Sequence, residues 1–307
     1  MKMIHISGLE KNYGRLEVLK GIDIDINCGE LVGYLGPNGS GKTTTLNIIS
    51  GIIKPDKGTV KILGADVLCE YEKVGSSVSV VFENHGLYPK LTAGENLEYF
   101  ARLKGAPKGV LRKYVDNALS SVELLEKKNT LVSTFSKGMM RRLAIARALI
   151  LDPRILILDE PFDGIDISSR YSLIQLLKNW IQKPEKCILL TSHSMADIEA
   201  LCNKLVIIHQ GRILTSDTIS SLQEKWNKNK YEVIVKDHSG PSRIQTILSK
   251  YSRIIDLDKK NGLFIIETSE NPAFISSYLK EEGIQHIEIK EKHTSLEEIY
   301  LELVGKK

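Results

Sequence analysis

The sequence of 307 residues contains few cysteines, and the four present are spread widely along the chain. They form no Cys-x-x-Cys pair, and none has a histidine nearby at the spacing of metal ligands. This pattern therefore predicts reduced, mostly buried thiols of a cytosolic protein instead of a metal site. The residues concerned are Cys28, Cys69, Cys187 and Cys202.

Long apolar runs are also missing from the sequence. No segment approaches the roughly 20 apolar residues that a helix needs to cross a bilayer. The amino-terminal stretch Met1–Ile6 alternates like a strand and lacks the apolar centre of a signal peptide. If the protein works at a membrane, another chain must therefore supply the membrane-spanning part.

An excess of charge of one sign is the third missing feature. The formal net charge is +4, and residues of both signs are scattered throughout. This balance gives no support to a nucleic-acid-binding surface. The length exceeds that of the usual single domain, so the chain has room for a large core and for more than one domain.

One glycine-rich segment organises the rest of the chain. It reads Gly36-Pro37-Asn38-Gly39-Ser40-Gly41-Lys42-Thr43 and fits the phosphate-loop pattern G-x-x-x-x-G-K-[ST] at every fixed position. A buried strand is predicted before it, at residues 31–35, and a helix after it, at residues 44–49. A glycine-rich turn with an accidental lysine would need neither element, so we interpret the segment as a phosphate loop.

The residues of this loop divide the work of binding phosphate. Gly39 and Gly41 let backbone N–H groups turn toward an anion, and the following helix adds positive charge at its amino end. Lys42 is expected to reach the β- and γ-phosphates, and the Thr43 hydroxyl to hold Mg²⁺. The sequence therefore predicts a nucleoside triphosphate site.

A second candidate lies at the end of a strand of four aliphatic residues, 155–158, which runs directly into Asp159 and Glu160. Such a strand lies in the centre of a sheet and brings both carboxylates to the edge where the phosphate loop also lies. One carboxylate can hold Mg²⁺ through its water shell while the other orients the attacking water. Paired acids can also be merely solvated, but the phosphate loop makes that reading improbable.

Three further candidates carry weaker signals. His193 follows the buried strand 188–191 and is a candidate for the γ-phosphate, although a lone histidine usually packs or lies on the surface. Ser136 is a good cap for the helix that follows it, which gives a second helix start suited to an anion or simply an ordinary capped helix. Tyr13, predicted in a loop, could stack on a base, although packing is its commoner use.

The order of these motifs resembles the ATP-binding subunit of an ABC transporter, over about residues 1–217. The resemblance implies that Tyr13 stacks on adenine, that the nucleotide-binding loop continues to Thr44, and that Glu160 is the catalytic base. It also implies that Asp166 belongs to the D-loop and that His193 is the switch histidine. We therefore expect a P-loop NTPase core of the α/β class and ATP hydrolysis.

Two positions depart from the family pattern. The signature segment, usually Leu-Ser-Gly-Gly-Gln, reads Phe135-Ser136-Lys137-Gly138-Met139. It keeps the serine and one glycine for γ-phosphate contact in trans. Glu83 stands where the family usually has a glutamine, and its carboxylate can still approach Mg²⁺. Both departures resemble variants in bacterial exporters, so an active ATPase is expected.

The resemblance also implies partners and a place of work. Two ATPase subunits, identical or different, are expected to sandwich ATP and Mg²⁺ between the phosphate loop of one and the signature segment of the other. A separate transmembrane permease subunit is expected to dock on residues 92–132 and on the loop Glu83–Pro89, at the cytoplasmic face of the membrane. We expect an exporter and no nucleic-acid partner, while the transported substrate is not encoded in this chain.

The expected domains are an ATPase core at residues 1–218 with a helical subdomain at about 92–150, a linker at 219–229, and an accessory domain at 230–307. The accessory domain shows the order βαββαβ of a small ferredoxin-like fold, with a final helix at 295–304. Asn261-Gly262 is a hairpin signal within it. Two alternatives remain at this point: an ABC ATPase that acts on ribosomes or DNA, and a module that senses ATP without appreciable turnover.

Overall fold

The computed structural model describes residues 1–227, 229–235, 241–258, 263–284, 286–292 and 294–305. It divides into two compact units, Met1–Ile219 and Ser220–Lys307. Each unit has a core of its own and is described separately.

A six-stranded sheet lies at the centre of the first unit, with strand order β10-β9-β3-β8-β7-β6. Five of its strands run parallel, and β10 pairs antiparallel with β9. Every residue of β3, β7 and β8 is buried, as expected for parallel strands covered on both faces. The bounds are β3 Leu31–Leu35, β6 Val78–Val81, β7 Ile155–Leu158, β8 Cys187–Thr191, β9 Lys204–His209 and β10 Arg212–Thr218.

A second, antiparallel sheet has the order β2-β1-β4-β5. Its strands are β1 Lys2–Tyr13, β2 Leu16–Asn27, β4 Lys57–Ile62 and β5 Ala65–Asp66. Its buried aliphatic residues share one core cluster with the large sheet and with helix α1 Lys42–Ile49. The phosphate loop that precedes α1 is therefore supported from both sheets.

The first two strands are longer than the sequence predicts, because its alternating pattern marks only residues 3–6, 18–19 and 22–26 as short strands. Their pairing runs from Lys2↔Asn27 to Tyr13↔Leu16 and passes through several register shifts. Those shifts interrupt the alternation of apolar residues that marks a regular strand, so the alternation predicts strands that are too short. The prediction that Tyr13 lies in a loop is wrong, because this residue ends β1.

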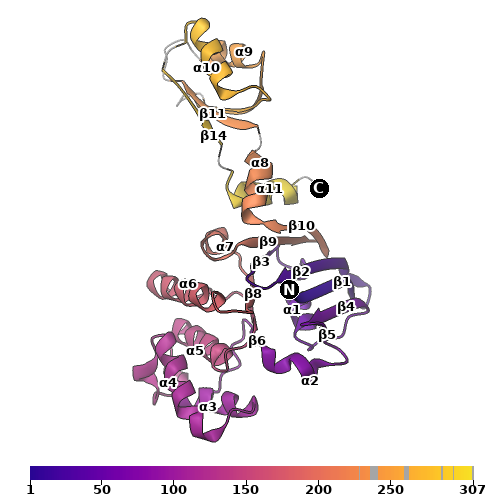
Figure 1. Ribbon diagram of the computed structural model, residues 1–307, viewed down its shortest axis with the longest axis vertical. Coiled ribbons are helices and arrows are strands. Elements are labelled where there is room, and N and C mark those ends of the chain that lie inside the picture. The colour runs from indigo at the N-terminus through magenta and orange to yellow at the C-terminus, as the bar shows by residue number, and fades with distance from the viewer. Residues whose placement is uncertain (228, 236–240, 259–262, 285, 293, 306–307) are drawn as a thin grey trace. The chain divides into compact units, whose positions relative to one another are not determined.

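Three helices form a separate helical region within the first unit, at the lower left of Figure 1: α3 Ala93–Leu103, α4 Leu111–Ser121 and α5 Lys137–Leu149. They share an apolar core that includes Leu97, Leu119 and Leu143. A capping box of Thr92 and Glu95 begins α3. The other helices of this unit are α2 Tyr71–Val74, α6 Ile167–Ile181 and α7 Met195–Leu201.

The second unit has the ferredoxin-like order βαββαβ. Its antiparallel sheet is ordered β12-β13-β11-β14, with α9 and α10 supplying apolar residues to one core. Helix α8 precedes this fold and α11 follows it, the latter begun by the reciprocal bonds of Ser295 and Glu298. The predicted Asn261-Gly262 turn lies outside the described residues. The bounds are α8 Ile219–Asn227, β11 Lys230–Val235, α9 Pro241–Leu248, β12 Arg253–Asp258, β13 Leu263–Glu267, α10 Pro272–Glu281, β14 Ile287–Glu291 and α11 Leu296–Gly305.

The sequence predicts that the cysteine thiols are reduced and mostly buried. All four cysteines are free, but only Cys187 and Cys202 are buried, whereas Cys28 and Cys69 lie exposed in connections between elements. The prediction of mostly buried thiols is therefore wrong for half of them.

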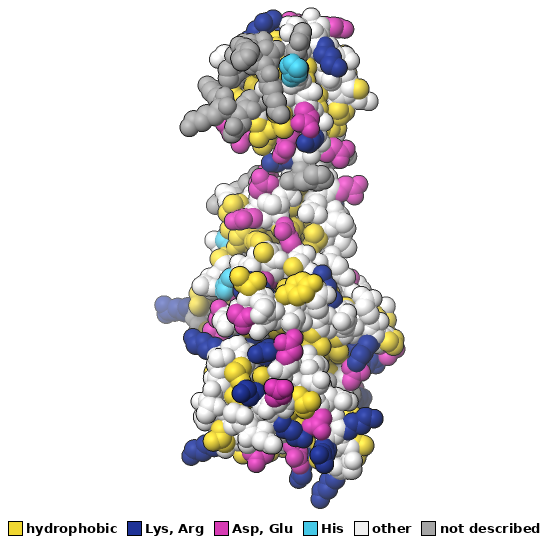
Figure 2. Space-filling view, turned by 90° about the vertical axis from the view of Figure 1, so that its left-hand side faces the viewer, with side chains coloured by type: hydrophobic (Ala, Val, Ile, Leu, Met, Phe, Trp, Pro, Cys, Tyr) yellow, Lys and Arg dark blue, Asp and Glu magenta, His cyan; other side chains and the backbone are white. Residues whose placement is uncertain are grey.

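Figure 2 shows side chains of both charges interspersed over the face that it views. Among the described helices, none combines the length and the apolar character that crossing a bilayer requires.

Candidate functional site

The phosphate loop joins the buried end of β3 to the start of α1. Gly39 and Gly41 have φ angles of 77° and 110°, in the region that favours glycine. A Cβ atom on Gly36 would meet the carbonyl oxygen of Ile208 at 2.2 Å. Among the residues that the structure describes, no side chain caps the amino end of α1, so its N–H groups remain available to an anion.

Lys42 is folded back onto this loop. Its Nζ atom donates to the carbonyl oxygens of Gly36 and Pro37, at 2.7 and 3.2 Å. Burial lowers the pKa of this amine, while the carboxylates of Glu160 and Asp159 act in the opposite direction. The positive charge is therefore held on the loop, within electrostatic reach of the two carboxylates.

Two hydroxyl groups beneath the loop differ in their bonding. The Tyr34 hydroxyl, fully buried in β3, lies 3.1 Å from Oγ1 of Thr45 and braces the first turn of α1. Oγ of Ser40 is buried and has no hydrogen-bond partner within the described structure. A buried hydroxyl without a partner is costly, and a phosphate oxygen would satisfy it.

The carboxyl ends of β7 and β8 are joined through one threonine. Oγ1 of Thr191 donates to Oδ1 of Asp159 at 2.6 Å and accepts from the backbone N–H of Glu160 at 2.9 Å. Asp159 is buried, and the bond from Thr191 fixes the orientation of its carboxylate. Both acids that the sequence predicted at this edge are present there.

Glu160 has an unusual backbone and environment. Its φ angle of 49° is left-handed, a conformation that a non-glycine residue adopts at some cost. Desolvation raises the pKa of its carboxyl group, partly opposed by His193 and Lys42. His193 contacts both of its oxygens: the backbone N–H donates to Oε2 at 3.2 Å, and Nε2 lies 3.0 Å from Oε1. A carboxylate with a raised pKa is a stronger base.

These groups surround a cavity of about 360 Å³. It brings together ten residues predicted from the sequence, Asn38, Gly39, Gly41, Lys42, Thr43, Thr44, Glu83, Asp159, Glu160 and His193. It is also lined by Leu16 and Val18, at the start of β2, which the sequence analysis missed. Their signal was weak, because an exposed leucine beside a hairpin turn is ordinary.

Tyr13 lies outside this set. It is 47% exposed and does not line the cavity, and its ring lies 5.7 Å from Nζ of Lys11. Contact with a base therefore remains a prediction.

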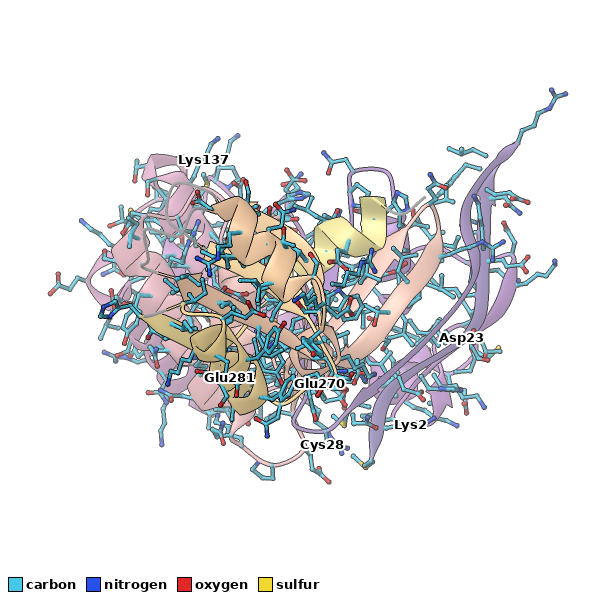
Figure 3. All side chains as sticks on the ribbon, turned by 90° about the horizontal axis from the view of Figure 1, so that it is seen from above. Lys2, Asp23, Cys28, Lys137, Glu270 and Glu281 are labelled. Atoms are coloured by element: carbon cyan, nitrogen blue, oxygen red, sulfur yellow. The ribbon has the colours of Figure 1, made fainter. Side chains whose placement is uncertain are left out.

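The signature segment lies apart from the cavity, at the start of α5. Oγ of Ser136 accepts from the N–H of Met139 at 3.2 Å, so the predicted cap is present. Lys137 is exposed and lies at the margin of the view in Figure 3. A Cβ atom on Gly138 would lie 3.7 Å from the carbonyl oxygen of Gly164, which places the segment beside the turn before Asp166. It faces outward, where another molecule could meet it.

The donor set of the cavity fits Mg²⁺. Hydroxyl and carboxylate oxygens are available from Thr43, Glu83 and Asp159, and hard cations prefer such ligands. Within the described residues no group of three or more acidic, histidine or cysteine side chains forms a metal cage.

Comparison with known proteins agrees with this geometry. The family model described as ABC transporter matches residues 19–163. The chain is 30% identical over 303 residues to the uncharacterized ABC transporter ATP-binding protein YhcH of Bacillus subtilis, covering 99% of this chain and 96% of that protein. It is 32% identical over 303 residues to the Nod factor export ATP-binding protein I of Burkholderia orbicola, covering 99% and 97%.

A solved structure shows the same likeness in three dimensions. The ATP-binding cassette MJ0796, a dimer in a post-hydrolysis state bound to ADP and Pi, superimposes with a TM-score of 0.65 at 27% identity. The match covers 71% of this chain and 99% of that cassette.

Proposed function

Because this chain belongs to the family of ABC transporter ATP-binding proteins, we propose that it is the ATPase that powers export through a separate membrane-spanning subunit. The observation that carries the proposal is the cavity in which the phosphate loop faces Asp159, Glu160 and His193. A cation, a row of open N–H groups and a strong base there meet the requirements for cleaving a phosphoanhydride.

We assign the chemical roles from this arrangement. Lys42 and the N–H groups of the loop hold the phosphates of ATP, and the hydroxyl of Ser40 adds a donor. Glu160 accepts the proton of the attacking water, and His193 fixes the direction of its carboxylate. Bound Mg²⁺ would neutralise phosphate charge, held by Thr43 and Asp159 with Glu83 nearby. The raised pKa of Glu160 suits the role of base.

The exposed signature segment supports assembly with a second ATPase subunit. Its four assigned residues, Ser136, Lys137, Gly138 and Met139, lie outside the cavity of their own chain. A partner chain whose bound ATP meets this segment would complete both sites at once. The dimeric cassette MJ0796 is consistent with such an assembly.

Export and the membrane partner rest on two kinds of support. One relative carries the name Nod factor export ATP-binding protein. No described helix of this chain could span a bilayer. The membrane partner itself is the part of the proposal that rests on the family. We place the chain at the cytoplasmic face of the membrane, where the loop Glu83–Pro89 and the helical region would receive that permease.

We propose the domains that the sequence predicts, an ATPase core at residues 1–218 and an accessory domain at 230–307. All residues assigned to the site lie in the first unit. Residues 1–219 expressed alone should hydrolyse ATP at a rate close to that of the full chain. An inactive but folded fragment would show that the second unit belongs to the catalytic core.

Co-purification tests the transporter assignment. The tagged chain is expressed with its chromosomal neighbours and recovered from detergent-solubilised membranes. A bound polytopic protein that stimulates ATP hydrolysis is the expected result. Recovery with ribosomes or DNA, or a chain that remains wholly free of membranes, would overturn the assignment and leave the nucleotide site intact.

A further inference from the structure

Arg141 is buried behind the cavity, on the first turns of α5. Only 2% of the residue is exposed. Its Nη1 atom donates to two backbone carbonyl oxygens, that of Phe82 at 3.2 Å and that of Asp159 at 3.4 Å. These carbonyls belong to segments that follow different strands, β6 and β7. A single side chain of the signature helix therefore joins both strand ends.

The two carbonyls occupy special positions in the sequence. Phe82 directly precedes Glu83, and Asp159 directly precedes Glu160. Glu83 and Glu160 are both carboxylates that line the cavity. Arg141 thus donates hydrogen bonds to the backbone carbonyl of the residue before each of these two glutamates.

The peptide group between Asp159 and Glu160 is fixed at both of its polar atoms. Its carbonyl oxygen accepts from Arg141, and its N–H donates to Oγ1 of Thr191. The plane of this peptide determines where the left-handed Glu160 directs its side chain. A conformation of this kind persists only where its surroundings enforce it. The two hydrogen bonds supply that enforcement from opposite sides.

The surroundings of the Arg141 guanidinium favour a role in positioning the backbone over a role in stabilising the fold. Within the described part of the chain its guanidinium makes no direct ion pair, although the carboxylates of Asp163, Asp159, Glu83 and Glu160 all act on it. Its Nε atom is buried and has no hydrogen-bond partner among the residues described. Burying a cation on such terms is expensive, and an apolar side chain would fill the space at lower cost.

Resting on the proposed ATPase function, we propose that Arg141 is a positioning residue that holds the Glu83 and Glu160 segments together and ties both to the signature helix. It does not line the cavity itself. Its loss should misdirect Glu160 and slow hydrolysis, while the phosphate loop continues to bind ATP.

The chain offers a matched control at the next position. Arg142 lies on the same helix, but its Nη1 atom donates to the carbonyl oxygen of Val122 at 3.2 Å, within the helical region. We compare Arg141→Met and Arg142→Met for kcat, KM for ATP, and thermal unfolding. A displacement of about 1 Å at a catalytic group can cost roughly 100-fold in rate. We therefore expect kcat of Arg141→Met to fall roughly 10- to 100-fold, with KM and the control nearly unchanged.

A second readout separates positioning from general damage to the signature helix. In a Glu160→Gln background, which stalls hydrolysis, the Arg141→Met chain should still form an ATP-dependent dimer, because its signature segment is intact. Loss of that dimer, or a kcat equal to that of Arg142→Met, would overturn the proposal. If Arg141→Met does not fold, Arg141→Lys is read instead, with a lowered kcat at unchanged KM expected and a wild-type kcat contradicting us. If the wild-type chain hydrolyses no ATP, the proposed function fails, which is a distinct result.

Discussion

His193 contacts both oxygens of the Glu160 carboxylate: its backbone N–H donates to Oε2 at 3.2 Å, and its Nε2 atom lies 3.0 Å from Oε1, which has no hydrogen-bond partner among the described residues. The two residues follow β8 and β7, which are neighbours in the large sheet. One residue thus limits the rotation of the carboxylate that we assign as the base. The imidazole is exposed and lines the cavity, so it can also meet a γ-phosphate.

Replacing this histidine tests that constraint. We expect His193→Ala to lower kcat by roughly 10- to 100-fold, because Glu160 loses a partner that directs it. ATP affinity should change little, since Lys42 and the phosphate loop remain. Steady-state hydrolysis and equilibrium nucleotide binding measure the two effects. His5→Ala, in the antiparallel sheet, is the control, and an equal loss in both variants would contradict the assignment.

The rate of hydrolysis should depend on pH through Glu160. A general base must be deprotonated, and burial raises the pKa of this carboxyl above the ordinary glutamate value of 4.5. The acidic limb of the kcat profile should therefore lie at a pH above 4.5. A limb at or below the ordinary value would show that another group limits the reaction.

The same raised pKa makes a prediction about folding. The neutral form of Glu160 fits the folded chain better than the charged form, so its contribution to stability is present below pH 4.5 and is lost as the pH rises through its folded pKa. Glu160→Gln should therefore gain stability relative to the wild type as the pH rises from about 4.5 to about 8. Thermal unfolding at several pH values measures this difference.

A surface glutamate supplies the control for that experiment. Glu185 also has a left-handed backbone, with φ of 57°, but is exposed and paired with Arg154 at 2.9 Å. Glu185→Gln should show no comparable gain with pH. A gain of equal size in both variants would mean that the effect does not arise from the site.

Lys42→Met should weaken ATP binding by at least roughly tenfold, the equivalent of one lost charge-assisted hydrogen bond. The folded chain should survive, because among the described residues Nζ of Lys42 bonds only carbonyl oxygens of its own loop. Titration with a fluorescent ATP analogue measures the affinity. Lys57→Met, at an exposed position at the start of β4, should bind like the wild type. Unaltered binding by Lys42→Met would refute the phosphate-loop assignment.

The features predicted correctly from the sequence are those whose signal is local. The short apolar run 31–35, directly before a glycine-rich loop, indicates a buried strand, and all five residues are buried in β3. The loop after it is recognised by the spacing of its glycines and lysine. The caps at Ser136 and Ser295 are likewise local, because each side chain bonds a backbone N–H three residues ahead.

The features missed depend on contacts between distant segments. Arg141 looked like one more basic residue of a helix, because only folding brings the carbonyls of Phe82 and Asp159 to it. Leu16 and Val18 gained a role only when the first hairpin was placed beside the phosphate loop. The length of that hairpin was underestimated because its register shifts break the strand pattern.

We propose that ATP joins two ATPase subunits, here two copies of this chain, until hydrolysis releases them. The most direct test is the mass of the Glu160→Gln chain in solution, measured by light scattering with and without Mg²⁺ and ATP. We predict a monomer without nucleotide, a dimer with ATP, and no dimer with ADP, together with a kcat lowered roughly 100- to 10,000-fold. A chain that remains monomeric with ATP, or that hydrolyses ATP at the wild-type rate, would contradict the account.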